Sequence, residues 1–134
     1  MQLNTYLLFN GHCEAAMKFY EQCLGGKITA MLAYEGSPAA EHVPAAMGKQ
    51  ILHAALSLGE DFNLLASDCP PDQYHKPQGF AVTLQISDLA KAESIFNALA
   101  EGGKTVMPFS KTFWAKGYGQ LEDKFGIPWM VNCA

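Results

Sequence analysis

The chain has 134 residues, of which 13 are acidic and 9 basic, so its formal net charge is −4 with neutral histidines. With 49% hydrophobic residues, a chain of this length forms one folded domain, or two very small modules, and is not disordered. Because the basic residues are few and form no cluster, we expect neither nucleic acid nor a membrane surface as a partner.

The N-terminal segment lacks the basic region of a secretory signal, and no apolar run approaches the ~18 residues of a membrane span. We therefore expect a cytoplasmic protein. The four cysteines form no Cys-x-x-Cys pair, which excludes a zinc knuckle or a redox motif of that type. We interpret them as reduced thiols that pack like small apolar residues.

The chain is self-similar when it is shifted by 77 residues. Alternating apolar residues then align at the start of each half, and each alignment ends at a Gly-Gly-Lys triplet. The aligned positions are Leu3, Thr5, Leu7 and Phe9 with Phe80, Val82, Leu84 and Ile86, and Gly25 to Lys27 with Gly102 to Lys104. Such a period indicates a repeated supersecondary unit.

In chain order, the first half reads as a strand ending at Phe9, a helix over 13–24 and strands over 27–34, 50–58 and 61–68. The second half reads as a strand from about 80, a helix that begins near Ser87 and Asp88, and strands over 104–107, 112–122 and 127–133. Residues 36–48 are a surface excursion with a short helix near 41–47. These elements predict an α+β fold of two βαβββ modules, 1–68 and 79–134, which share one domain and are joined by a linker over 69–78.

Strand alternation assigns the side chains to two faces. The set Leu3, Thr5, Leu7 and Phe9 should pack on the helix, together with its repeat mates. Asn4, Tyr6 and Leu8 should face the opposite side, with Ala81, Thr83 and Gln85 as their counterparts. His53 falls with Ala55 and Ser57 on that same opposite side. Both a structural role and a ligand-contacting role remain open for His53.

Several segments resemble a known family along nearly the whole chain. They include Tyr6 to Phe9, Leu24 to Gly26, Leu64 to Asp68, Thr112 to Gly119 and Asp123 to Trp129. With the tandem modules, these segments resemble the glyoxalase, bleomycin-resistance and extradiol-dioxygenase superfamily, called vicinal oxygen chelate. Within it the chain resembles the PhnB-like proteins, which are often labelled a demethylubiquinone methyltransferase type. The resemblance implies a curled mixed sheet that forms a cup.

In metal-dependent relatives, four ligands come from the first and last strands of the two modules. The matching windows in this chain are 3–6, 63–66, 80–83 and 128–131, and none contains His, Glu, Asp or Cys. A transition metal needs several such donors. We therefore expect no metal at the shared site and no other cofactor. Met130 falls at the approximate position of the last ligand.

The cup-facing residues are apolar or neutral and polar, which suits a small organic ligand. The predicted pocket residues are Asn4, Tyr6, His53, Thr83, Trp114 and Met130. Gly117 and Gly119 on either side of Tyr118 suggest a mobile strand edge or a bulge near the pocket. A cup filled by its own side chains remains an alternative.

The sequence thus favours a small-molecule-binding protein, and no catalytic residue is predicted. One alternative is a metal-dependent enzyme with unusual ligands, for example His53 with Glu122 or Asp123. Asp123 more simply starts a hairpin turn. Another alternative is a methyltransferase, although no Gly-rich strand-to-helix loop for a cosubstrate is present. From relatives and from the uncovered edge strands of such modules, we expect a homodimer.

Overall fold

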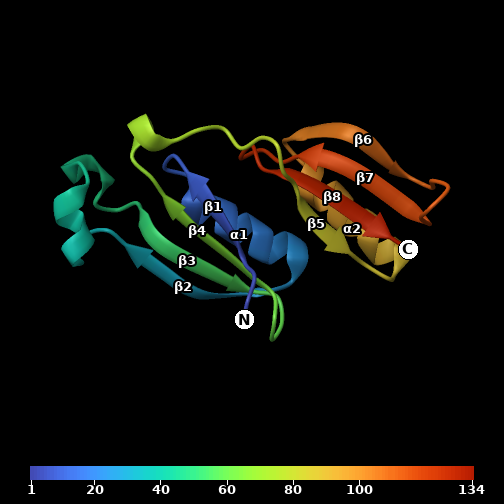
Figure 1. Cartoon of the computed structure of the whole chain (residues 1–134), viewed down its shortest axis with the longest axis horizontal. Coiled ribbons are helices and arrows are strands. Elements are labelled where there is room, and N and C mark those ends of the chain that lie inside the picture. The colour runs from blue at the N-terminus through green and yellow to red at the C-terminus, as the bar shows by residue number, and fades with distance from the viewer. The chain divides into compact units, whose positions relative to one another are not determined.

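The computed structural model describes all 134 residues, which form two compact units, Met1–His75 and Lys76–Ala134 (Figure 1). Each unit contains one α-helix and one four-stranded mixed sheet, in the order β-α-β-β-β. The predicted α+β class and the two tandem βαβββ modules are therefore confirmed.

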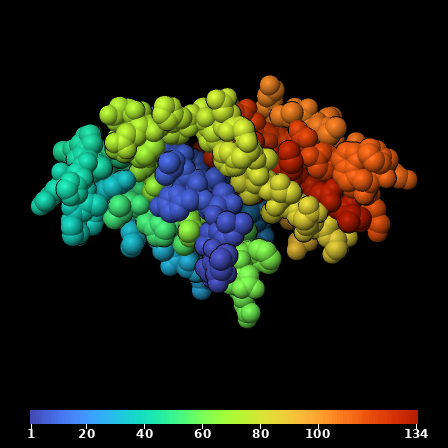
Figure 2. Space-filling model, in the orientation of Figure 1, coloured from blue at the N-terminus to red at the C-terminus, as the bar shows by residue number.

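The sheet of the first unit, sheet A, has the strand order β1-β4-β3-β2. Its strand β1 pairs parallel with β4, and the other two pairings are antiparallel. Between β2 and β3 the chain makes two short 3-10 helices that lie at the surface beyond the strand ends (Figures 1 and 2). The elements are β1 (Thr5–Phe9), α1 (Cys13–Leu24), β2 (Lys27–Ala33), β3 (Ile51–Ser57) and β4 (Asn63–Asp68).

The second unit repeats this topology in sheet B, with the order β5-β8-β7-β6 and a parallel β5–β8 pair. The elements are β5 (Val82–Gln85), α2 (Leu89–Ala100), β6 (Lys104–Ser110), β7 (Gly117–Glu122) and β8 (Pro128–Cys133). Each α-helix has 12 residues. Neither has the length and apolarity that a membrane-crossing helix requires.

Helix α1 has the predicted bounds and packs on one face of sheet A. It ends where Gly25 adopts a φ of 76°, a left-handed conformation that glycine takes without strain. Its buried residues are Cys13, Ala16, Met17 and Tyr20. Phe19 and Cys23 are only half-buried.

The glycines of β7 have a packing role that corrects the prediction of a mobile edge. A Cβ on Gly117 would lie 2.4 Å from the Phe109 ring, and one on Gly119 would lie 2.6 Å from the Phe96 ring. The two phenylalanine rings pack together with centroids 5.7 Å apart. Gly117 and Gly119 therefore make room for aromatic rings in the core of the second unit. The register irregularities lie in the neighbouring strand β6.

Three other expectations are corrected. Leu3 and Phe80 do not pack on the helices: Leu3 is 96% exposed and Phe80 is exposed, because β1 and β5 begin only at Thr5 and Val82. Residues 112–116 are not part of a strand. They form a turn in which the Thr112 hydroxyl accepts from the Ala115 N–H at 3.1 Å. Strand β6 instead extends to Ser110, beyond the predicted end.

Candidate functional site on the open sheet faces

Each sheet has one face covered by its helix and one face turned away from it, which we call the open face. On β1 the helix side holds the buried Leu7 and Phe9, and the open face holds Tyr6 and Leu8, which are about half exposed. On β5 the same alternation exposes Thr83 and Gln85. The alternation predicted for the first strands is thus correct within β1 and β5.

Tyr6 and His53 meet on the open face of sheet A. The Tyr6 hydroxyl lies 3.1 Å from His53 Nδ1, and the ring centroids are 5.8 Å apart. The strand that separates them is β4, whose Leu65 pairs with Tyr6 on one side and Ala55 on the other. His53 therefore has a neighbour that satisfies one ring nitrogen. The nearby predicted residue Asn4 has a buried side-chain oxygen without a hydrogen-bond partner.

The open face of sheet B carries two of the predicted residues directly. Thr83 and Met130 are cross-strand partners in the β5–β8 pair, and Met130 is opposite Gln120 of β7. Trp114 lies in the loop before β7, is 51% exposed and packs edge-on against Tyr118 at 5.3 Å. Tyr118 accepts a hydrogen bond from the Gln120 side-chain amide at 3.0 Å.

A pocket of about 460 Å³ lies at the end of sheet B where β5 and β8 begin. Of the six predicted pocket residues, only Met130 lines it. Asn4, Tyr6 and His53 belong to the first unit, while Thr83 of β5 and Trp114 of the loop before β7 lie outside this lining. The walls are Pro77, Gln78, Gly79, Phe80, Ala81, Val106, Gln120, Leu121, Glu122, Pro128, Trp129 and Met130.

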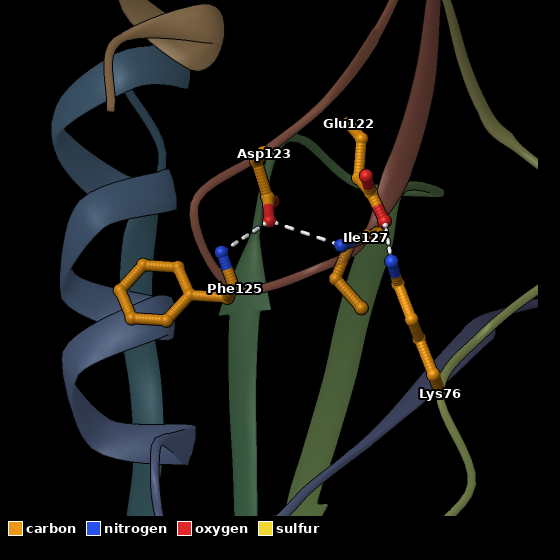
Figure 3. Close-up of polar contacts among 5 residues, drawn as sticks. All are labelled: Lys76, Glu122, Asp123, Phe125 and Ile127. Atoms are coloured by element: carbon orange, nitrogen blue, oxygen red, sulfur yellow. Dashed lines mark hydrogen bonds and ion pairs between the residues drawn. The ribbon is translucent and has the colours of Figure 1, made fainter. Parts of the chain in front are cut away.

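The acidic residues beside this pocket already have partners (Figure 3). Glu122 forms an ion pair with Lys76 at 2.7 Å. Asp123 is 3% exposed and accepts from the Phe125 and Ile127 N–H groups through Oδ1, at 2.8 and 3.0 Å. Its Oδ2 accepts from Trp129 Nε1 at 2.9 Å. Asp123 thus starts the β7–β8 turn, as predicted.

The alternative metal site, His53 with Glu122 or Asp123, gains no support from these contacts. The structure contains no group of three or more His, Cys, Asp or Glu side chains arranged to hold a metal ion. The open-face residues Tyr6, Thr83 and Met130 are instead neutral, and the carboxylate of Glu122 is paired with Lys76. A transition-metal ion would find no charged or imidazole cluster among them.

Sequence reasoning missed several residues of these faces. Leu32 was not assigned, although its pairing with His53 puts it on the open face of sheet A, where it is 55% exposed. Its strand contains an irregularity that breaks simple alternation. The pocket residues Phe80, Val106 and Gln120 were missed because a linker and a bulged strand form that wall. Gln120 is the cross-strand partner of Met130, so the β7–β8 register would have placed it on the same face as this predicted pocket residue.

The buried carboxylate of Asp68 is a second feature that alternation did not reveal. Its Oδ1 accepts from the Gly11 and Cys13 N–H groups at 2.8 and 3.0 Å, and its Oδ2 accepts from the Ile51 N–H at 2.9 Å. The Tyr34 hydroxyl donates to the Asp68 main-chain oxygen at 2.6 Å. These bonds tie the start of α1 to the start of β3 and the end of β4, on the helix side of sheet A.

This carboxylate also affects the nearby thiols and phenol. All four cysteines are free, in agreement with the interpretation from the sequence. Burial, followed by the charge of Asp68, raises the pKa of the Cys13 thiol to about 12. Burial and then Asp68 also raise the pKa of Tyr34. The pKa of Cys69 is raised chiefly by burial. Cys13 is therefore a packed thiol and not a reactive nucleophile.

Comparison with known proteins agrees with this architecture. Residues 2–131 match the family model described as the Glyoxalase/Bleomycin resistance protein/Dioxygenase superfamily. The chain is 33% identical to protein YjdN of Escherichia coli strain K12, over 98% of this chain and 95% of that protein.

Two solved structures show the same fold over essentially the whole chain. The crystal structure of protein PA1353 from Pseudomonas aeruginosa has a TM-score of 0.90 and 45% identity, covering 99% of this chain and 97% of that one. A Bacillus cereus protein described as a putative 3-demethylubiquinone-9 3-methyltransferase, PhnB protein, has a TM-score of 0.82 and 23% identity, with full coverage of both chains. The tandem modules and the family match together establish that this chain belongs to the glyoxalase, bleomycin-resistance and dioxygenase superfamily.

Proposed function

We propose that this protein is a PhnB-like member of the superfamily that binds a small organic molecule on the open faces of its sheets, without a metal at the superfamily's shared site. The observation that carries the proposal is the pocket of about 460 Å³ over sheet B. Its volume lies within the range of about 300–1,000 Å³ that is usual for ligand pockets.

The chemistry of the pocket supports a mainly apolar ligand. Met130, Val106 and Phe80 supply apolar surface, and the Met130 thioether adapts readily to irregular shapes. Gln120 supplies an amide for orientation. The carboxylate of Glu122 is compensated by Lys76, so the pocket has no uncompensated charge from this residue.

The proposed ligand-contacting residues remain Asn4, Tyr6 and His53 in the first unit, and Thr83, Trp114 and Met130 in the second. The exposed Tyr6, Leu8, Leu32 and Trp114 support this choice, because large apolar side chains left uncovered by their own helix often mark binding surfaces.

The neutral fluorophore N-phenyl-1-naphthylamine tests the sheet B pocket. We expect saturable binding, weakened more than about tenfold by Met130→Glu, since a carboxylate is costly in an apolar site. Ala90→Glu is the matched control, because Ala90 is exposed on α2. No saturable binding, or equal losses in both variants, would contradict the proposal. If the probe binds as expected, mass spectrometry of small molecules that co-purify with the protein would identify the natural ligand.

The two enzyme alternatives have their own readouts. Elemental analysis that finds one Zn, Ni, Mn or Fe per chain would favour a metal-dependent enzyme. Saturable binding of S-adenosylmethionine would favour a methyltransferase, the activity named in the description of the Bacillus cereus relative, whose 23% identity is evidence of the fold only.

A cytoplasmic homodimer completes the proposal. Each sheet is open and has two edge strands, β1 and β2 in sheet A and β5 and β6 in sheet B, and such edges favour association. Light scattering should give twice the chain mass of 14.6 kDa, and a mass of one chain at micromolar concentration would contradict the dimer. Cell fractionation tests the location.

A further inference from the structure

The hydrogen-bonded pair Tyr6 and His53 joins two strands that are not neighbours. Tyr6 belongs to β1 and His53 to β3, with β4 between them. The Tyr6 hydroxyl reaches across to within 3.1 Å of Nδ1, and Tyr6 remains 45% exposed. The pair is therefore accessible from the open face of sheet A and does not form part of the core against α1.

The surroundings of this pair are apolar. Leu8 is next but one to Tyr6 on β1, and Leu32 pairs with His53 from β2, and both are about half exposed. Leu65 of β4 lies beside Tyr6.

Lys27, Asp68 and Tyr34 are further titratable groups of the first unit. Lys27 is opposite Ser57 at the far end of β3. The Asp68 carboxylate is bonded to the start of α1, and the Tyr34 hydroxyl donates to the Asp68 main chain. Tyr34 is near enough to Tyr6 that Tyr6 contributes to the raised pKa of Tyr34, after burial, Asp68 and Cys69. The titratable pair joined by a hydrogen bond on this surface is Tyr6 and His53.

The pair can change its donors with protonation. A neutral imidazole can accept the phenol O–H at Nδ1, which leaves only Nε2–H as a donor. When imidazole takes a proton from solvent, Nδ1–H donates to the phenol oxygen instead. The phenol O–H is then released, so that Nε2–H and O–H become two donors on one positively charged pair. No covalent bond other than those to the moving protons is made or broken.

We propose that Tyr6 and His53 form a recognition site for the carboxylate of a small apolar acid, and that binding takes up one proton on His53. The half-exposed leucines Leu8 and Leu32 contact the apolar body of the acid, and the two donors bind its carboxylate. This inference rests on the proposed function and specifies the ligand class for the open face of sheet A.

The test compares 1-naphthoate with its neutral analogue 1-naphthamide. Titration calorimetry at about pH 6 and 8 should show about tenfold weaker naphthoate binding at the higher pH, because binding that takes up a proton weakens as the proton concentration falls. Naphthamide should bind with the same affinity at both pH values. Calorimetry in two buffers of different ionisation enthalpy should show proton uptake with naphthoate only. Tyr6→Phe should weaken naphthoate several-fold at pH 6, through loss of one donor.

His53→Gln should remove the pH dependence and the proton uptake, with urea unfolding as the check that the variant folds. Leu8→Ala is the matched control and should weaken both probes alike while keeping the pH dependence. No naphthoate binding at millimolar concentration, equal affinities of both probes at both pH values, or pH dependence that persists in His53→Gln would overturn the inference. The N-phenyl-1-naphthylamine titration with Met130→Glu tests the proposed function separately, on sheet B.

Discussion

In the first unit the N-terminus of α1 is held by Asp68, a residue 55 positions away from Cys13, whereas in the second unit α2 is capped by the adjacent Asp88. His12, at the cap position of α1, makes no side-chain cap. The Asp88 side chain accepts from the Lys91 N–H at 3.0 Å. Two copies of one fold thus satisfy free N–H groups at the helix start by a long-range contact at the first helical residue, Cys13, in one case and by a local contact at the third helical residue, Lys91, in the other.

The second unit also has a buried aspartate, but it serves a different element. Asp123 accepts two N–H groups of the β7–β8 turn and the Trp129 indole. The corresponding β3–β4 turn of the first unit uses Gly59, whose φ is 139°. The two units therefore share the positions of their apolar residues, whereas their buried aspartates, Asp68 and Asp123, bind different elements.

The largest effect should come from Asp68→Ala. It leaves three N–H groups without their acceptor, the buried ones of Cys13 and Ile51 and the part-buried one of Gly11, and we expect a loss of about 4 kcal/mol in the free energy of unfolding. Urea denaturation measures it. Asp68→Asn keeps the shape and an acceptor oxygen and should lose less. If Asp68→Ala lowered the free energy of unfolding by no more than the loss of an exposed helix cap, about 1 kcal/mol, the stabilising role of this long-range contact would be contradicted.

Asp123→Ala should have the second largest effect, a loss of about 3 kcal/mol in the free energy of unfolding, because the N–H groups of the turn and of the Trp129 indole lose their acceptor. In a Trp114→Phe background Trp129 is the remaining tryptophan, and its emission should shift to the red if the indole becomes solvated. Unchanged emission together with unchanged stability would show that the turn holds without this carboxylate.

Gly119→Ala tests the difference between the two cores. The new Cβ would lie 2.6 Å from the Phe96 ring and 2.9 Å from Phe109 Cα, and we expect a loss of about 2 kcal/mol from overpacking. In the first unit Ala54 occupies the equivalent register position, since it lies opposite Ala66 as Gly119 lies opposite Val131. Ala54→Gly should cost only about 1 kcal/mol. A Gly119→Ala variant as stable as the wild type would remove the packing explanation.

Asp88→Ala should cost about 1 kcal/mol, the usual value for losing a local cap at an exposed helix start. Thermal unfolding is sensitive enough to measure it, and Asp88→Ser should restore most of the loss. If Asp88→Ala proved as costly as Asp68→Ala, local and long-range caps would be energetically equivalent in this fold.

The smallest effect concerns alkaline pH and the first unit. Because the pKa of Cys13 rises from 9.0 to about 12 on folding, the unfolded chain ionises first. The stability that depends on the protonated thiol is complete below pH 9 and declines as the pH rises towards 12. At about pH 9.5 the loss should be just under ~1 kcal/mol. Cys13→Ala should reduce this decline, and an unchanged pH profile would show that Cys13 is not its source.

The repeat made most of the fold predictable from the sequence. Apolar spacing gave the bounds of α1 correctly, and strand parity placed Tyr6 and Leu8 opposite Leu7 and Phe9, because both signals are local. Parity failed where a strand had not yet begun, at Leu3, and where irregularities shift the register, in β6.

The candidate site was less predictable, because its contacts connect residues far apart in the chain. The Tyr6–His53 hydrogen bond spans 47 positions and requires knowledge of the strand order. The pocket wall near Phe80 and Val106 depends on the path of the linker and on a bulged strand. Neither feature has a local sequence signal.

The Asp68 contact also has a consequence for the order of events during translation. Both the cap of α1 and the parallel partner of β1 are provided by β4, the last strand of the first unit. A ribosome-bound chain that has not yet exposed β4 therefore carries α1 with free N–H groups and β1 with an open edge. We expect the first unit to become protected from proteolysis in one step, when Asp68 leaves the exit tunnel, and not gradually as each element emerges.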